Sequence, residues 1–288
     1  MRIVTKNLSY YYSAKTKFSV HALDGVSLTI EEGEFFGIIG HTGSGKSTFI
    51  QHLNGLIRPE KNCGSVVVGE FDLTDSKCDV KKLRSKVGMV FQYPEYQLFA
   101  ETVFEDVAFG LKNFENLTAE ETEKRVKDAL TTVGLNYEEV KDKSPFELSG
   151  GQKRRVAIAG VIVTRPEVLV LDEPVAGLDP KGKREFFALL HDLHASFVKT
   201  IIIVSHDMDN VAENCTRVAI FDHGKIYKEG TVEDIFSCPD ELVSLGLDVP
   251  VTGYVSGLMA KKGARIRTNF SIDDFTDKVI QKIKGGVR

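Results

Sequence analysis

Three stretches of the sequence carry residue types suited to binding a nucleoside triphosphate and splitting its terminal anhydride. Residues 40–48 read GHTGSGKST and fit the phosphate-loop pattern G-x-x-x-x-G-K-[ST]. Residues 168–171 are apolar and are followed by the acidic pair Asp172 and Glu173. Residues 148–152, which read LSGGQ, lie between the other two stretches. Their order along one chain is more specific than any one of them alone.

The phosphate loop lies between an apolar segment that ends at Ile39 and a helix expected to begin near Lys46. Its glycines let the backbone approach a phosphate without a Cβ clash, and amide N–H groups at the helix start point at the anion. The Lys46 ammonium would reach the β- and γ-phosphates, and the Ser47 hydroxyl would ligate Mg²⁺. A chance glycine turn is the alternative. We expect the loop to bind ATP through Gly40, His41, Thr42, Gly43, Ser44, Gly45, Lys46, Ser47 and Thr48.

The acidic pair is suited to two different tasks in phosphoryl transfer. Asp172, at the end of a buried strand, is expected to hold Mg²⁺ through a coordinated water. Glu173 follows immediately and faces the other way, because side chains alternate along a strand. Its carboxylate can therefore hydrogen-bond a water molecule near the γ-phosphate. A solvated strand end without chemistry is the alternative interpretation of the pair.

The LSGGQ stretch predicts a second anion site. It comes just before the helical pattern of residues 152–163, and so places a hydroxyl and unhindered N–H groups at a helix start. One chain already has its own phosphate loop, so a second anion site has no use within a monomer. The alternative is that these glycines only cap a helix.

The elements that must position these residues follow from the hydrophobic pattern. Four apolar runs are expected to be buried strands of a largely parallel sheet, with helical patterns between them: residues 35–39, 87–91, 168–171 and 200–204. Residues 10–28, with 65–71, are expected to form a smaller antiparallel layer, and residues from about 93 to 158 are mostly helical. The fold class predicted is therefore α/β.

Composition excludes several classes of protein. The 288 residues carry a net charge of −4 and are 42% hydrophobic, which fits neither a basic nucleic-acid binder nor a disordered chain. No apolar run approaches the roughly 20 residues needed to span a bilayer, and the N-terminus carries no signal-peptide core. Four cysteines without a C-x-x-C pair favour reduced thiols in a cytosolic protein. Any work at a membrane would then depend on a partner.

With these motifs in this order, residues 1–230 resemble the ATP-binding cassette (ABC) ATPases. The resemblance implies an ABC-type P-loop nucleotide-binding domain over 1–230, with a RecA-like core, an antiparallel β layer and a helical subdomain at about 93–158. A small C-terminal extension, 231–288, follows. In this superfamily LSGGQ closes over the ATP held by the opposite protomer, so the chain is half of a pair. The residues implied in that contact are Ser149, Gly150, Gly151 and Gln152.

The resemblance also implies individual roles. Glu173 is the catalytic base, and His206, in the position of the switch histidine, bonds the γ-phosphate. Gln92 matches the Q-loop glutamine that touches Mg²⁺ or its water, and Asp179 belongs to the D-loop beside the nucleotide. The remaining histidines at 52, 191, 194 and 223 are interpreted as structural. The adenine is expected to stack on Tyr12, with Tyr11 or Tyr10 as alternatives, or the tyrosines merely cover a strand surface.

Four further stretches resemble the ATPase subunits of energy-coupling factor (ECF) transporters, and the first and last resemble the second of their two ATPase paralogues. They are residues 41–48, 51–56, 91–99 and 145–148. Such transporters take up vitamins or metal ions. The implied partners are a second ATPase, forming a heterodimer or alternatively a homodimer, a membrane coupling subunit and a substrate-binding membrane subunit. The chain would act at the cytoplasmic face of the cell membrane, without nucleic acid.

Residues 93–107 are expected to form the groove that receives the coupling helices. Leu98 and Phe99 are adjacent apolar residues, and an apolar patch rimmed by carboxylates suits a partner helix that carries arginines. The alternative is that both apolar side chains pack inside the helical subdomain. The acidic rim is expected to comprise Glu95, Glu101, Glu105 and Asp106.

The C-terminal extension is expected to contain a helix capped by Ser271, with Phe275, Val279 and Ile283 on one apolar face. By resemblance this tail helps to hold the two ATPases together. Its basic residues favour a solvated helix face over a lipid or nucleic-acid contact: Lys261, Lys262, Arg265, Arg267, Lys278, Lys282, Lys284 and Arg288.

Two other functions compete with an ECF importer. The chain could be the ATPase of another ABC importer or of an exporter. It could also be a non-transport cassette protein, although translation-type relatives carry two cassettes and repair types insert long coiled coils, neither of which occurs here. The sequence does not name the solute, because specificity resides in another subunit.

Overall fold

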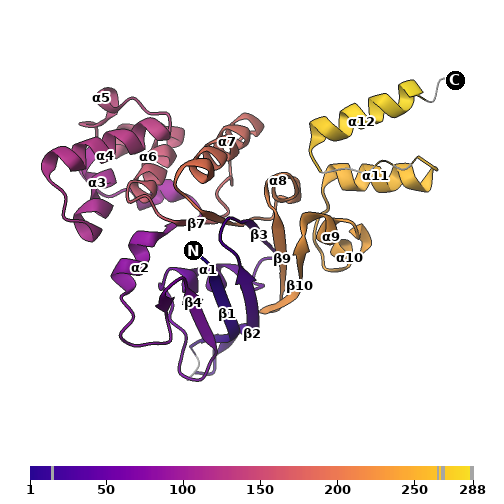
Figure 1. The fold of residues 1–288 in the computed structure, drawn as a ribbon, viewed down its shortest axis with the longest axis horizontal. Helices are drawn as coiled ribbons and strands as arrows, with labels where there is room; N and C mark the ends of the chain where they lie inside the picture. The colour runs from indigo at the N-terminus through magenta and orange to yellow at the C-terminus, as the bar shows by residue number, and fades with distance from the viewer. Residues whose placement is uncertain (14–15, 265, 267–269, 286–288) are drawn as a thin grey trace.

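Apolar runs bounded by turn residues form the central sheet of this protein. The computed structural model describes residues 1–13, 16–264, 266 and 270–285, and contains a six-stranded sheet of order β10-β9-β3-β8-β7-β6 (Figure 1). All of its strands are parallel except β10. The strands are β3 (Phe35–Ile39), β6 (Val87–Val90), β7 (Val168–Asp172), β8 (Thr200–Val204), β9 (Arg217–Asp222) and β10 (Lys225–Thr231).

A smaller antiparallel sheet, of order β2-β1-β4-β5, lies beside the central one. It differs from the expected layer, because the pairing begins at Ile3, well before residue 10. In β1 every residue from Ile3 to Thr5 pairs with both neighbouring strands. Its strands are β1 (Ile3–Tyr12), β2 (Val20–Ile30), β4 (Ser65–Val68) and β5 (Phe71–Asp72).

The two faces of the central sheet contribute to two separate hydrophobic clusters. In β3, Phe36 and Ile38 pack with the antiparallel sheet and with helix α1 (Lys46–Leu53), whereas Phe35 and Ile39 pack on the opposite side. The same alternation holds in β8. Because both faces are covered, these strands are continuously apolar rather than alternating with polar residues.

A group of helices stands apart from the sheets and corresponds to the helical region expected over residues 93–158 (Figure 1). Thr118 and Ser149 begin two of these helices with a capping box, in which the cap hydroxyl and the side chain three residues later satisfy each other's backbone N–H groups. The elements are 3₁₀ helix η1 (Pro94–Gln97), α3 (Val103–Phe114), α4 (Ala119–Thr132), α5 (Tyr137–Val140), 3₁₀ helix η2 (Pro145–Glu147) and α6 (Gly150–Ile162). Helix α2 (Val80–Lys86) lies outside this region and directly precedes β6.

The remaining helices divide into two groups. Buried side chains of α9 and α10, such as Phe236 and Leu242, belong to the main hydrophobic cluster, so the chain beyond residue 230 still packs on the sheet-bearing core. In contrast, α11 and α12 project away from the sheets (Figure 1). The helices are α7 (Pro180–Ser196), α8 (Met208–Asn214), α9 (Val232–Phe236), α10 (Pro239–Ser244), α11 (Val251–Lys261) and α12 (Ile272–Gly285).

The C-terminal helix forms where it was expected, but its apolar face is only partly covered. The Ser271 hydroxyl accepts from the backbone N–H of Asp274, as expected for a cap. Phe275 is buried and Val279 half-buried, while Ile283 is exposed. Arg265, Arg267 and Arg288 of the basic set lie outside the described residues.

None of the helices among the described residues combines the length and the apolar character needed to cross a membrane. The four cysteines carry free thiols.

A buried histidine in α1 predicts how stability depends on pH. His52 has no exposed surface, and its Nδ1 lies 2.8 Å from the carbonyl oxygen of Thr48. A carbonyl only accepts, so Nδ1 carries the proton; Nε2 is buried without a partner. Burial lowers the pKa of His52, although the bond to Thr48 acts the other way.

Because the folded pKa lies below the unfolded value of about 6.5, the unfolded chain binds the extra proton first. The free energy of unfolding should therefore fall as the pH drops below about 6.5. His52→Gln should weaken this dependence, and His191→Gln, at an exposed histidine, should not. Denaturant unfolding between neutral and mildly acidic pH measures both slopes; equal slopes for wild type and His52→Gln would exclude His52 as the cause.

Candidate active site

Four neighbouring strands of the central sheet deliver the predicted site residues to one edge. The phosphate loop follows β3, His206 follows β8, the acidic pair ends β7, and Gln92 follows β6. Val204 is level with both Ile38 and Asp172, so these strands end at the same height. The carboxyl edge of a parallel sheet is where such folds bind ligands.

The phosphate loop curls around the ammonium of Lys46. Its Nζ donates to the carbonyl oxygens of Gly40, at 2.7 Å, and His41, at 2.8 Å. Burial lowers the pKa of Lys46, and the carboxylates of Glu173 and Asp172 act in the opposite direction. Backbone carbonyls thus keep a largely buried cation in place at the centre of the loop.

Gly40 is a position that only glycine fits. Its φ of +148° is rare for other residues, and a Cβ would lie 2.2 Å from the carbonyl oxygen of Phe221. The start of the loop is therefore pressed against β9, so the path of the loop depends on the neighbouring strand.

Asp172 and Ser47 offer paired oxygen ligands beside the loop. Burial raises the pKa of Asp172, while a hydrogen bond with the Ser47 side chain acts the other way. A hydroxyl and a carboxylate are the hard oxygen donors that Mg²⁺ prefers. The residues present therefore fit that ion.

Glu173 adopts a left-handed backbone conformation, with φ of +48°. This region is sparsely populated by residues other than glycine, and holding one there costs on the order of 1–3 kcal/mol. The Glu173 N–H donates to the carbonyl of Val204 at 2.9 Å, and its Oε2 lies 2.8 Å from His206 Nδ1. The strained turn brings together two residues that are thirty-three positions apart in sequence.

The three candidate tyrosines differ in their surroundings. The Tyr12 hydroxyl lies 3.2 Å from Oγ1 of Thr48 in the helix that follows the phosphate loop. Tyr11 is instead stacked on His21, with ring centroids 3.9 Å apart. Tyr10 is packed edge-on against both Tyr12 and the buried His52. Tyr12 thus contacts the helix that follows the phosphate loop, and its side chain is partly exposed.

The LSGGQ residues lie apart from the phosphate loop. Ser149 caps α6, and its hydroxyl and N–H are both engaged with Gln152. Gly150 and Gly151 are exposed, and a Cβ on either would meet nothing within 4 Å. Among the described residues, no hydrogen bond joins 149–152 to 40–48. This helix start is open to solvent in the single chain.

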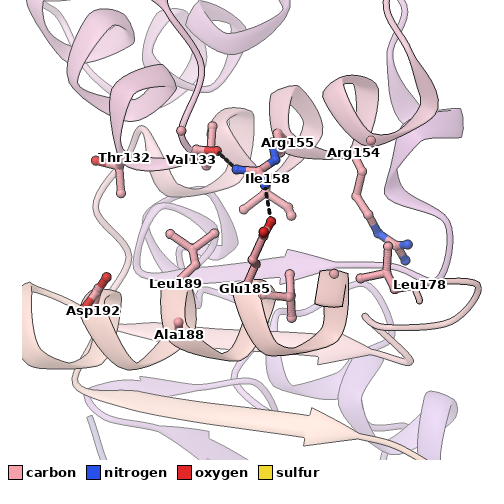
Figure 2. A pocket seen from close by; sticks show the side chains of 14 residues that line it. Thr132, Val133, Arg154, Arg155, Ile158, Leu178, Glu185, Ala188, Leu189 and Asp192 are labelled. Atoms are coloured by element: carbon pink, nitrogen blue, oxygen red, sulfur yellow. Dashed lines mark hydrogen bonds and ion pairs between the residues drawn. The ribbon is translucent and has the colours of Figure 1, made fainter. Parts of the chain in front are cut away.

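Figure 2 shows the cavity of about 500 Å³ between α6 and α7, which Gly151 helps to line. Arg155 crosses it, donating to the carbonyl of Val133 at 2.6 Å and to Glu185 of α7 at 3.0 Å. Arg155 therefore adds a polar link between α6 and α7 across the cavity, beside the hydrophobic cluster that the helical region and the core share.

Arg154 is a site-proximal residue that the sequence analysis did not single out. It is buried, its Nη1 donates to the carbonyl of Ala176 at 3.0 Å, and its Nε lies 4.0 Å from Oε2 of Glu95. It therefore links α6 to the loop after Glu173 and to the segment after Gln92. The only sequence signal was the basic run Lys153, Arg154 and Arg155 directly after the signature.

Asp179 and Gln92 occupy different environments. The Asp179 side chain caps α7 by accepting from the N–H of Gly182 at 2.7 Å. Gln92 is exposed at the end of β6. Gln92 therefore lies on the edge that holds the phosphate loop, whereas the Asp179 carboxylate is already engaged in capping.

The prediction that residues 93–107 expose Leu98, Glu95 and Asp106 for docking is wrong. Leu98 is buried in the main hydrophobic cluster, and Glu95 faces Arg154. Asp106 is also buried, where its carboxylate accepts from the N–H groups of Phe99 and Ala100, each at 2.9 Å. The alternation of the chain at this turn sends Leu98 inward and Phe99 outward.

The exposed remainder of that surface is a groove with aromatic walls. Phe99 is 60% and Phe109 50% exposed, and their rings meet edge to face with centroids 4.8 Å apart. Both side chains line a cavity of about 300 Å³. Glu101 and Glu105 are exposed on the same segment.

Comparison with known proteins gives consistent results. A family model described as ABC transporter matches residues 23–176. The chain is 49% identical to the energy-coupling factor transporter ATP-binding protein EcfA2 of Clostridium tetani, covering 98% of this chain and 97% of that protein. It is 47% identical to the protein of the same name from Clostridium perfringens, covering 99% of each.

Solved structures are similar as well. Clostridium perfringens cbiO1, described as part of the ABC transporter complex cbiONQ, has a TM-score of 0.72 and 38% identity, covering 88% of this chain and 97% of that one. The ATP-binding cassette MJ0796, in a dimeric post-hydrolysis state with ADP and Pi, has a TM-score of 0.70 and 31% identity, covering 80% and 98%.

Proposed function

We infer that this chain, which belongs to the ABC transporter family and within it to the ATP-binding proteins of energy-coupling factor transporters, is the ATP-hydrolysing subunit of an ECF-type importer. The observation that carries the chemistry is the common edge of β3, β8 and β7, where Lys46, His206 and Glu173 meet. For the imported solute we propose a vitamin or another micronutrient, selected by a different subunit.

We propose that the phosphate loop holds ATP, with Lys46 at the β- and γ-phosphates and Tyr12 against the adenine. Ser47 and Asp172 would hold Mg²⁺, with Gln92 reaching the ion or its water. When bound, the ion neutralises charge on the phosphate oxygens. Ser47 and Asp172 already share a hydrogen bond beside the loop, which supports their assignment to one site.

Glu173 is proposed to take the proton from the attacking water, and His206 to bond the γ-phosphate. In the nucleotide-free chain these two side chains bond each other at 2.8 Å. The bond uses Oε2 of Glu173, so its other oxygen can accept from a water. We propose that ATP binding turns His206 toward the phosphate.

We propose that hydrolysis requires a second ATPase subunit, in a heterodimer, with a homodimer as the alternative. One support is the exposed start of α6, which lies apart from the phosphate loop of its own chain. The other is the dimeric state of the related MJ0796. Asp179, in the loop between the base and α7, would lie near the shared nucleotide.

The C-terminal helices offer a surface for the same pairing. Val251, Tyr254 and Leu258 recur at helical spacing on α11, and all three are more than 40% exposed. An uncovered apolar stripe of this kind marks an interaction site. We propose that residues 231–288 contribute to dimerisation.

The aromatic groove at Phe99 and Phe109 is proposed to dock a helix of a membrane coupling subunit, which in turn binds the substrate-binding membrane subunit. Exposed rings would supply apolar burial, and Glu101 and Glu105 would fix the orientation of a basic helix. The chain would thereby be held peripherally at the cytoplasmic face of the membrane.

Replacing Glu173 by Gln tests the chemistry. The amide keeps the shape but loses basicity, so we expect ATP binding to persist and turnover to fall by about 10²–10⁴-fold. The assay is steady-state ATPase activity of the assembled complex, with the partner ATPase inactivated at its own catalytic glutamate. Glu120→Gln, at an exposed position, is the control. Turnover close to wild type would remove Glu173 from the base role.

Replacing Gly150 by Arg tests the shared site. A Cβ here meets nothing within 4 Å and the position is exposed, so folding and binding of ATP by the isolated chain should be unchanged. In the dimer, the arginine would enter the space needed by the partner's nucleotide, and ATPase activity should fall sharply. Wild-type activity should also rise with protein concentration or added partner. A concentration-independent rate from a proven monomer would contradict a composite site.

Reversing the charge at Glu101 tests the docking surface. Glu101→Lys should weaken co-purification with the membrane subunits and reduce solute uptake, while leaving nucleotide binding unchanged. Glu120→Lys, an equal reversal at the exposed start of α4, is the matched control. If Glu101→Lys complexes assemble and transport normally, the docking surface lies elsewhere.

A further inference from the structure

A group of side chains that could ligate a metal lies where the phosphate loop meets the end of β9. His41 of the loop, Asp222 at the end of β9 and His223 in the following turn place their ligand atoms within 4.8 Å of one another. The ring centroids of His41 and His223 are 5.2 Å apart. Each of these side chains is at least partly exposed to solvent.

The hydrogen bonds of His41 define what its second nitrogen can do. Nδ1 lies 3.0 Å from the carbonyl oxygen of Thr42, which only accepts, so Nδ1 carries a proton. Nε2 lies 2.9 Å from Oδ1 of Asp222. In a neutral imidazole this would bring two acceptors face to face. A cation is therefore required between them, either a proton on Nε2 or a metal ion.

The position of His223 favours a metal over a proton alone. Its Nε2 lies 3.8 Å from the same Asp222 Oδ1, so two imidazoles converge on one carboxylate. The His223 side chain is 84% exposed in a turn, and its ring can rotate toward a shared ion. A backbone carbonyl on the far nitrogen, as Thr42 provides for His41, is the usual arrangement for a histidine that ligates a metal.

We propose that His41, Asp222 and His223 bind a divalent transition-metal ion of the zinc class. Two imidazoles and a carboxylate, with further positions open to water, suit Zn²⁺ and similar ions rather than Mg²⁺ or Ca²⁺, which prefer oxygen ligands. Ligand distances near 2.0–2.2 Å require that the His223 ring moves inward and that His41 Nε2 and Asp222 Oδ1, now 2.9 Å apart, separate slightly to admit the ion. The site uses other residues than Ser47 and Asp172, and it would give His223, interpreted from sequence as structural, a role as a ligand.

Such an ion would cross-link the phosphate loop to the β9–β10 turn. The two segments are already joined, because the N–H of Gly224 donates to the carbonyl of Ser44 at 3.0 Å. With His41 ligated, the first part of the loop would be fixed to β9 on a second side. Metal occupancy would therefore restrict the segment that must close around the phosphates.

The test is metal binding by the untagged full chain, freed of metal by chelation and titrated with Zn²⁺ in a calorimeter. We expect one site, and His223→Gln should weaken it by at least about tenfold, as ligand-shell changes do. Asp222→Asn should weaken it similarly. His191→Gln, an exposed histidine on α7, should bind as wild type. Zn²⁺ should also raise the melting temperature of wild type more than that of His223→Gln.

Titration with Co²⁺ distinguishes this site from the free cysteines. A site of imidazoles and a carboxylate gives only weak visible bands, whereas cysteine ligation adds an intense thiolate-to-cobalt band in the near ultraviolet. An intense thiolate band at the first equivalent would overturn the proposal. Unchanged affinity in His223→Gln and Asp222→Asn would do the same. Absence of Zn²⁺ binding would mean that His41 and Asp222 share only a proton.

Discussion

The active site depends on the register of four parallel strands whose faces are both buried. Because Ile38, Val204 and Asp172 are level across β3, β8 and β7, the loops that follow them meet at one edge. The apolar side chains that fix this register alternate between two separate hydrophobic clusters. A slip of one residue would exchange every side chain between the faces, so packing specifies the site as strictly as it specifies the fold.

Charge at this edge is balanced by close neighbours rather than by solvent. The ammonium of Lys46 is buried, which disfavours its charged form, but it donates to two loop carbonyls and faces Asp172 and Glu173. Glu173 in turn holds a left-handed backbone conformation and bonds His206. The side chains at this edge thus form part of a polar network before any nucleotide binds. The surrounding strands maintain the strained turn at Glu173.

The helical region shares one hydrophobic cluster with the core, and two arginines of α6 add polar links between them. Arg155 spans a cavity to Glu185, while Arg154 reaches the loop after Glu173 and faces Glu95 without a hydrogen bond. One buried side chain thus contacts the loop after Glu173 and the segment after Gln92, and it belongs to the helix that begins at the signature.

The sequence alone determined the residues of the phosphate loop, the acidic pair and the signature, together with the strands that carry them, because these features depend on local spacing and on hydrophobic period. Tertiary structure decided the rest. It turned Leu98 and Asp106 inward and Phe99 outward, brought Arg154 to Glu95, and placed His41 beside Asp222 and His223. Such encounters join residues far apart in the chain, and their geometry follows from how whole elements pack, which no local pattern records.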